Sequence, residues 1–195
     1  AVVVIAGDGD PAMFEQVIKQ HFSDWKAEGP APRDPNFGVL DQNAPQVKNI
    51  VEAGQPLGIS LAMVRPWVKR VDTLENTYRL YFEYFAQAVV NRRLENLART
   101  GGSFLVATAS QEYLSRSADV TVVQAVPIAD WKDALRDVRS VIEDARINAP
   151  TAQEIEREAN EIAAFLRKEA DNALNEPGAR LADDLVRAVD INEVV

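Results

Sequence analysis

The sequence contains no cysteine and only one histidine, His21, among its 195 residues. The absence of cysteine excludes disulfides, thiolate nucleophiles and cysteine-ligated metals. One imidazole cannot supply a two-histidine zinc motif such as H-x-x-E-H. A serine–histidine–aspartate arrangement that uses His21 stays open, although no G-x-S-x-G or similar motif accompanies it. We expect His21 to be structural, because it lies near the C-terminus of a predicted helix, where the helix dipole favours a partly charged imidazole.

Long apolar runs and an excess of basic residues are missing as well. No apolar stretch approaches the ~20 residues that a membrane helix needs, so the sequence predicts no membrane span. The net charge is −9, with 30 acidic and 21 basic side chains. Nucleic acid and anionic membranes are bound by clustered Lys and Arg, so neither is an expected partner.

Most of the negative charge lies in residues 130–195, where Glu154, Glu158 and Glu161 follow one side of a predicted helix. Carboxylates at this spacing could hold a hard cation. Turn and backbone ligands are missing from this stretch, so we interpret the three glutamates as a solvated helix face.

The chain opens on an apolar run, "AVVVIAGDGDP". Residues 1–6 are β-branched and continuous, which predicts a buried strand. Asp10 and Pro11 then predict the N-cap and first turn of a helix that ends near Phe22 or Trp25. The Gly-Asp-Gly-Asp turn matches neither G-x-G-x-x-G nor G-x-x-x-x-G-K-[ST], and its two carboxylates would repel phosphate. A phosphate-binding loop is therefore not expected.

The remaining pattern predicts strands followed by helices. A proline-rich stretch at 29–37 predicts a linker. Two strands are expected at Val47–Val51 and Leu57–Val64, and two adjacent strands at 103–113 and 117–127. A long helix is expected between these two pairs of strands, begun by the capping pair Asp72 and Glu75 and ended by Thr100-Gly101-Gly102. Its wide apolar face consists of Leu74, Tyr78, Tyr81, Phe82, Phe85, Val89 and Leu94. We expect the aromatic residues of this helix to be core residues, and these are Tyr78, Tyr81, Phe82, Tyr84 and Phe85.

Three further helices complete the prediction. Asp130 begins the first, the capping box Thr151–Glu154 begins the second, and Ala179–Val189 forms the third after a break at Glu176-Pro177-Gly178. Because strands and helices do not alternate strictly, the order predicts an α+β fold, with helices packed on one face of a largely antiparallel sheet.

Several segments together resemble the M16 (pitrilysin/insulinase) zinc metallopeptidases. The first resembles that family's strand, G-D-x-D-P turn and helix ending in F-x-D-W, here "VVVIAGDGDPAMFEQVIKQHFSDWK". The stretches "NRRLENLARTGGSFLVATAS", "TAQEIEREANEIAAFLRK" and "RLADDLVRAV" are similar to later segments of the second α+β domain of a family half, and they occur in the family's order.

This resemblance implies a domain division and the place of the metal. Residues 1–28 would be the trailing strand and helix of the preceding peptidase domain, 29–37 a linker, and 38–195 the second α+β domain. In the family the H-x-x-E-H motif and the third ligand, a glutamate, precede the G-D-x-D-P strand. The resemblance therefore implies no cofactor in this segment, with zinc bound elsewhere in a longer parent protein.

The resemblance also suggests two substrate-binding residues. Active carboxyl halves carry an arginine followed seven residues later by a substrate-binding tyrosine. Arg99 matches the arginine, but Val106 occupies the tyrosine position and the nearest aromatic residue is Phe104. We therefore take Arg99 and Phe104 as candidate substrate-binding residues, name no catalytic residue, and favour the amino half of the parent.

The expected function is that of a non-catalytic domain that helps to enclose and bind peptide substrate, where a sheet edge could pair with an extended peptide. Two alternatives stay open: a metal-free structural or assembly subunit with the same fold, and an acidic stand-alone binding module. Expected partners are the remaining domains of the parent protease, the peptide substrate, and a second copy joined through the N-terminal strand and helix. The resemblance to large bacterial members implies the periplasm, and the cytoplasm stays open because the absence of cysteine does not distinguish the two compartments.

Overall fold

The computed structural model describes residues 2–26, 28–30, 33, 36, 38, 40, 45–68, 70, 73–114 and 117–191. The chain forms two compact units, residues 37–164 and residues 1–36 together with 165–195. None of the helices in these ranges is long and apolar enough to cross a membrane. The predicted domain boundaries, at 28 and 37, stay a prediction.

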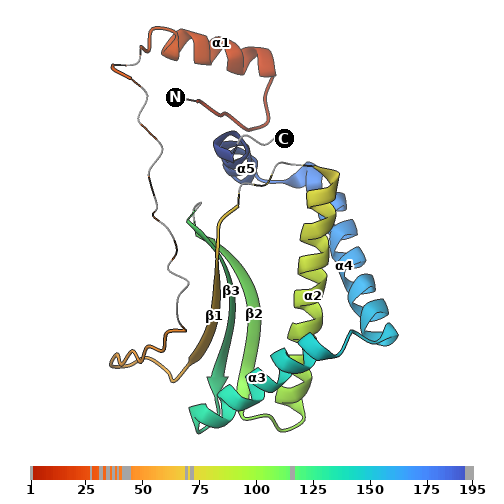
Figure 1. Ribbon diagram of the computed structural model, residues 1–195. Helices are drawn as coiled ribbons and strands as arrows, with labels where there is room; N and C mark the ends of the chain where they lie inside the picture. Colours follow the sequence, from red (N-terminus) through yellow and green to blue (C-terminus); the bar gives the residue numbers. More distant parts are fainter. Residues whose placement is uncertain are drawn as a thin grey trace. The chain divides into compact units, whose positions relative to one another are not determined.

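The unit of residues 37–164 is built on a three-stranded antiparallel sheet with the order β1-β3-β2. Its elements are β1 (Ile59–Pro66), α2 (Leu74–Arg99), β2 (Phe104–Leu114), β3 (Ala118–Pro127), α3 (Trp131–Ile147) and the start of α4 (Ala152–Asn172). Figure 1 shows α2 and α3 on the same face of this sheet. The predicted α+β class, with helices on one face of an antiparallel sheet, is confirmed.

The hydrophobic core of this unit lies between the sheet and the two helices. Leu94 of α2, Phe104 of β2 and Val138 of α3 are its largest fully buried side chains. The central strand β3 has buried apolar side chains on both faces, since alternate residues of a strand point in opposite directions. The core members are Leu94, Phe104, Ala109, Val123, Ala125, Ala134, Val138 and Val141.

Local signals begin α3 and α4 and end α2 as predicted. The Asp130 carboxylate accepts from the N–H of Lys132 at the start of α3. Thr151 and Glu154 form a reciprocal capping box, with the Thr151 N–H donating to Glu154 at 2.8 Å and the Glu154 N–H donating to Thr151 Oγ1 at 3.2 Å. Thr73 caps α2, and Asp72 lies outside the described residues. Gly101 ends α2 with a φ of 106°, a conformation that favours glycine.

Two predicted strands are wrong. Residues 2–6 and Val47–Val51 are not assigned to any strand, and Val47 is 98% exposed. A strand is stable only when a neighbour satisfies its backbone groups and its side chains are covered. Neither run has such a neighbour among the described residues, so β-branched composition alone does not produce a strand here.

The aromatic face of α2 also differs from the prediction. Val89 and Leu94, in the second half of the helix, are buried as expected. In the first half, however, Tyr78, Tyr81, Phe82 and Tyr84 are exposed within the part of the chain that the structure describes, and Phe82 reaches 73%. The sheet and α3 cover only the later turns of α2, so a continuous apolar face does not become a continuous core.

The second unit contains α1 (Pro11–Phe22), the end of α4, a 3-10 turn at Ala173–Asn175 and α5 (Gly178–Ile191). The Asp10 carboxylate caps α1 and Pro11 occupies its first turn, as predicted. A Cβ atom at Gly178 would lie 3.0 Å from the Ala6 carbonyl oxygen, so the first segment and α5 approach closely because this position is a glycine.

Candidate functional site

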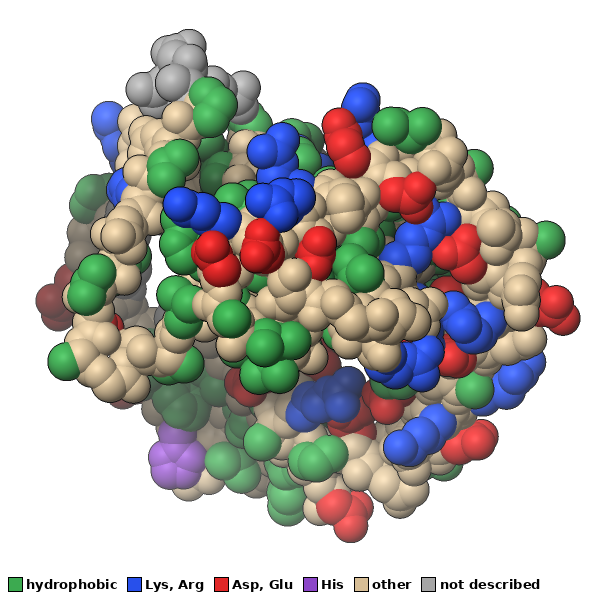
Figure 2. Space-filling model, turned by 90° about the horizontal axis from the view of Figure 1, so that it is seen from below, with side chains coloured by type: hydrophobic (Ala, Val, Ile, Leu, Met, Phe, Trp, Pro, Cys, Tyr) green, Lys and Arg blue, Asp and Glu red, His purple; other side chains and the backbone are tan. Residues whose placement is uncertain are grey.

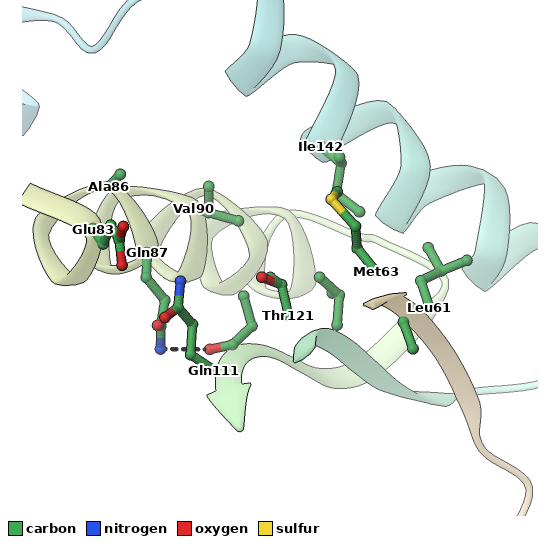
Figure 3. Close-up of a pocket in the computed structure, with 12 residues that line it drawn as sticks. Leu61, Met63, Glu83, Ala86, Gln87, Val90, Gln111, Thr121 and Ile142 are labelled. Carbon is green, nitrogen blue, oxygen red and sulfur yellow. Dashed lines mark hydrogen bonds between the residues drawn. The ribbon is translucent and has the colours of Figure 1, made fainter. Parts of the chain in front are cut away.

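One of the two outer edges of the sheet is closed by side chains of α2. The Asn91 amide donates to the Ala109 carbonyl oxygen at 3.1 Å and accepts from the Ala109 N–H at 2.6 Å. Gln87 donates to the same carbonyl at 2.9 Å, the bond drawn in Figure 3. Both backbone groups in the middle of β2 are therefore satisfied as a neighbouring strand would satisfy them, and no strand can be added there.

The other edge, β1, is open. The backbone N–H and C=O of Ala109 point away from β3, so Ala109 and Val123 form a non-hydrogen-bonded pair of the antiparallel ladder. The backbone N–H and C=O of Val123 therefore point toward β1. Val123 lies opposite Leu61, so Leu61 faces β3 and its neighbours Ser60 and Ala62 face outward. By the same alternation, the backbone N–H and C=O of Val64 also point outward. No hydrogen bond to these outward N–H and C=O groups is found among the described residues, so β1 can accept another extended segment.

An apolar cavity of about 440 Å³ lies beside this edge, between the sheet and the two helices. Figure 3 shows Glu83, Gln87 and Gln111 toward one end and Leu61, Met63 and Ile142 toward the other. Its remaining lining residues are Ala62, Ala86, Val90, Ala109, Thr121 and Val123. At the polar end, Arg70 Nη1 lies 3.5 Å from Glu83 Oε2, and Arg70 Nη2 lies 3.7 Å from Oδ2 of the buried Asp119. The cavity thus combines apolar walls with a few polar groups, as ligand pockets do.

A second groove, of about 600 Å³, adjoins the first and lies between β1 and α3. Leu61 and Ile142 line both, so the two hollows meet at these side chains. The second groove has a different character, because three cationic residues of α3 line it. Its other lining residues are Lys132, Leu135, Arg136, Arg139, Ser140 and Glu143.

Of the three glutamates of α4 that the sequence predicts to be solvated, Glu161 is exposed, whereas Glu154 and Glu158 are covered. Glu158 is buried, and its Oε1 lies 3.0 Å from Arg92 Nε of α2. Glu154 forms a bidentate pair with Arg93, at 2.7 Å from Nε and 3.1 Å from Nη2. Two consecutive arginines of α2 therefore hold α4, and Arg93 also reaches Asp144 of α3 at 2.9 Å. The acidic side chains are matched by arginines, which leaves them no role as cation ligands here.

These contacts predict how stability depends on acid. Hydrogen bonds from Arg93 and Thr151 lower the pKa of Glu154 to about 2, from an ordinary value of 4.5. A carboxylate with a lowered folded-state pKa stabilises the protein above its unfolded pKa, and this contribution is lost as the pH falls toward the folded value. We expect Glu154→Gln to lower the free energy of unfolding by on the order of 2 kcal/mol at pH 7. The free energy of unfolding of this variant should also depend less on pH between about pH 5 and pH 2. Urea unfolding at several pH values measures the free energy of unfolding of both proteins. The control is Glu156→Gln, at an exposed position of the same helix. If the free energies of Glu154→Gln and the wild type change with pH in parallel, the prediction is wrong.

The structure places the two candidate substrate-binding residues differently. Arg99 is exposed in the last turn of α2 and donates to Asn96 at 2.7 Å. Phe104 is 0% exposed and belongs to the core. Val106 is exposed on β2. β3 separates β2 from the open edge of β1, so the structure does not bring these residues to that edge, and their contact with peptide stays a prediction.

The described ranges offer no candidate metal site. No group of three or more His, Asp or Glu side chains in these ranges could hold a metal ion. His21 lies in the last turn of α1. On the face that Figure 2 shows, basic and acidic side chains are interspersed.

Three solved structures share this fold at low sequence identity. The first, the periplasmic protease PqqL from Escherichia coli, has a TM-score of 0.78 at 16% identity, over 96% of this chain and 21% of PqqL. The first half of PqqL, solved separately, has a TM-score of 0.73 at 15% identity, over 96% of this chain and 40% of that one. A protein described as a predicted insulinase family protease, from Yersinia pestis, has a TM-score of 0.73 at 14% identity. The match covers 97% of this chain and 41% of that one.

The chain thus spans about a fifth of the length of PqqL. A comparison with curated proteins finds no match. Residues 1–162 match the family described as the Peptidase M16 inactive domain. This match covers most of the sequence and agrees with the fold. The chain therefore belongs to the M16 peptidase family, as its inactive domain.

Proposed function

We propose that this chain is the non-catalytic domain of a zinc metalloendopeptidase, and that it helps to enclose peptide substrate and binds it in extended form along β1. The observation that carries this proposal is the open edge of β1 beside an apolar cavity of about 440 Å³. Main-chain hydrogen bonds to a sheet edge give affinity for any extended peptide, and pockets for alternate side chains give specificity. Both parts occur side by side at β1.

The rest of the proposal concerns the parent protein. Zinc and the general base would lie in another domain, where the metal would supply Lewis-acid chemistry for peptide hydrolysis. This chain would contribute binding and no catalytic residue. Its kinship with an inactive M16 domain supports this division, and the likeness in fold to the periplasmic protease PqqL supports a periplasmic location. Arg99 and Phe104 remain proposed peptide contacts.

Ala62→Pro provides a sharp test of the open edge. The Ala62 N–H points outward, so proline removes a donor that peptide would use and leaves the ladder with β3 intact. We expect the variant to fold and to bind an extended apolar peptide at least tenfold more weakly. Fluorescence polarisation with a labelled peptide of alternating Val and Thr measures binding, and circular dichroism measures folding.

The matched control is Gln124→Ala, on the central strand β3 and exposed, which should leave the affinity unchanged. If Ala62→Pro binds peptide as well as the wild type does, the peptide does not pair with β1 and the proposal fails. If neither protein binds any extended peptide, the metal-free structural subunit becomes the better account of this fold.

A second copy of the chain is the competing occupant of the same edge. Residues 2–6 are apolar and extended and pair with no strand in the described part of the chain, and a second copy could use them for strand exchange. Light scattering distinguishes the two occupants, because a self-associated chain would be dimeric before peptide is added and peptide would dissociate it.

A further inference from the structure

Resting on this proposed function, we propose that the groove between β1 and α3 selects peptides by charge: it accepts an extended segment with a large apolar side chain and, two residues away, an acidic one. The first step concerns direction. A residue added opposite Leu61 or Met63 directs its side chain to the same face of the sheet as those residues, which is the face that α3 covers. Alternate side chains of a bound peptide therefore enter this groove.

The second step concerns the apolar position. Leu61, Leu135 and Ile142 come from β1 and α3 and line the groove. The volume of about 600 Å³ accommodates a leucine or an aromatic side chain together with its neighbour on the same face. An apolar side chain placed here would cover surfaces of these three residues that otherwise face water, which favours binding.

The third step concerns charge. Lys132, Arg136 and Arg139 line the groove against a single carboxylate, Glu143. Arg136 is paired with Asp133 at 2.7 Å, and Glu143 is paired with Arg146 at 2.8 Å. Lys132 and Arg139 have no ion-pair partner within 4 Å in the described ranges, and the Lys132 ammonium lies 5.7 Å from the centre of the Trp131 ring.

Arg139 also acts electrostatically on Glu143, but Glu143 is already paired with Arg146, so the groove keeps an excess of positive charge. This excess favours a carboxylate and disfavours another cation. The fixed positions of α3 above β1 place Lys132 and Arg139 next to the apolar position. Successive side chains on one face of a strand lie two residues apart. The groove thus fits a peptide pattern of an apolar residue, any residue, and then Glu or Asp, in one of the two strand directions.

The experiment uses the full chain and labelled peptides that alternate Val and Thr around a central Leu. They differ only in carrying Glu, Gln or Lys two residues before or two residues after that Leu. We expect the Glu peptide with the favourable spacing to bind about tenfold more tightly than its Lys counterpart, with the Gln peptide between them. Raising the salt concentration should shrink the difference.

Lys132→Gln/Arg139→Gln should remove the preference, so that the Glu, Gln and Lys peptides bind this variant with equal affinity. Lys168→Gln, an exposed residue that does not line the groove, should keep the preference. Equal binding of the Glu, Gln and Lys peptides to the wild type would overturn this inference and leave the proposed function standing. A preference that survives the double substitution would also overturn it. Failure of every peptide to bind would instead count against the proposed function.

Discussion

Replacing Arg92 with methionine is expected to lower the free energy of unfolding by about 3 kcal/mol, because it leaves a buried carboxylate without its main partner. The Glu158 side chain is only 4% exposed and lies 3.0 Å from Arg92 Nε. Arg157 also contacts Glu158, at 3.2 Å, so part of the charge stays compensated. The same substitution breaks two further ion pairs, from Arg92 Nη1 to Glu95 at 2.8 Å and from Arg92 Nη2 to Glu161 at 2.6 Å. Both glutamates are about half exposed, so these pairs contribute little to the free energy of unfolding.

Urea denaturation measures this effect, and a second substitution identifies its cause. Arg92→Met/Glu158→Leu replaces the pair by apolar groups, and we expect it to recover most of the lost stability. The matched control is Arg146→Met, which breaks an exposed pair with Glu143 on α3 and should cost less than about 1 kcal/mol. A double variant that is less stable than Arg92→Met would show that the loss comes from packing and not from an unpaired charge.

Phe104→Ala is expected to cost about 3–5 kcal/mol, a large share of the stability of a domain of this size. Phe104 is 0% exposed and belongs to the core cluster with Leu94 and Val138. Truncation there removes buried apolar surface and leaves a cavity between the sheet and the helices. The adjacent Leu105 is 68% exposed, so Leu105→Ala should change the stability by less than about 1 kcal/mol. Thermal and urea unfolding of the two variants would show the contrast.

The same position also separates packing from peptide binding. Phe104→Leu keeps an apolar side chain in the core and should fold. Peptide affinity is measured for folded Phe104→Leu and, for comparison, for Arg99→Ala. If the affinity of Phe104→Leu is unchanged, Phe104 serves only as a core residue. A weaker affinity at unchanged stability would instead support the predicted contact.

The starts of three helices were predicted correctly because neighbouring residues determine them. Asp10, Asp130 and the Thr151–Glu154 box lie within one helical turn of the groups they cap, so their signal is complete in four residues. The runs at 2–6 and 47–51 have a typical strand composition, but a strand also depends on a partner far along the chain. Composition alone could not show that this partner is missing among the described residues.

The ion pairs that hold α4 also join residues far apart in sequence. Glu154 and Glu158 look like surface residues of an amphipathic helix until α2 places Arg92 and Arg93 against them, about 60 residues away. A signal was present, since two adjacent arginines lie between Val89 and Leu94, which are both buried. Charges at that position need nearby counter-charges. The closure of β2 by Asn91 has no comparable signature, because an asparagine in a helix is equally common at the surface.

The amide of Asn91 also limits how copies of this fold can assemble. A sheet with two free edges can extend in both directions and form an open ribbon of unlimited length. Here the central residue of β2 is already saturated by Asn91 and Gln87, so growth can begin only at β1. When β1 strands of two molecules meet, they form a closed pair with no further edge to offer. The side chains of Asn91 and Gln87 would thereby limit any edge-to-edge assembly of this sheet to two copies.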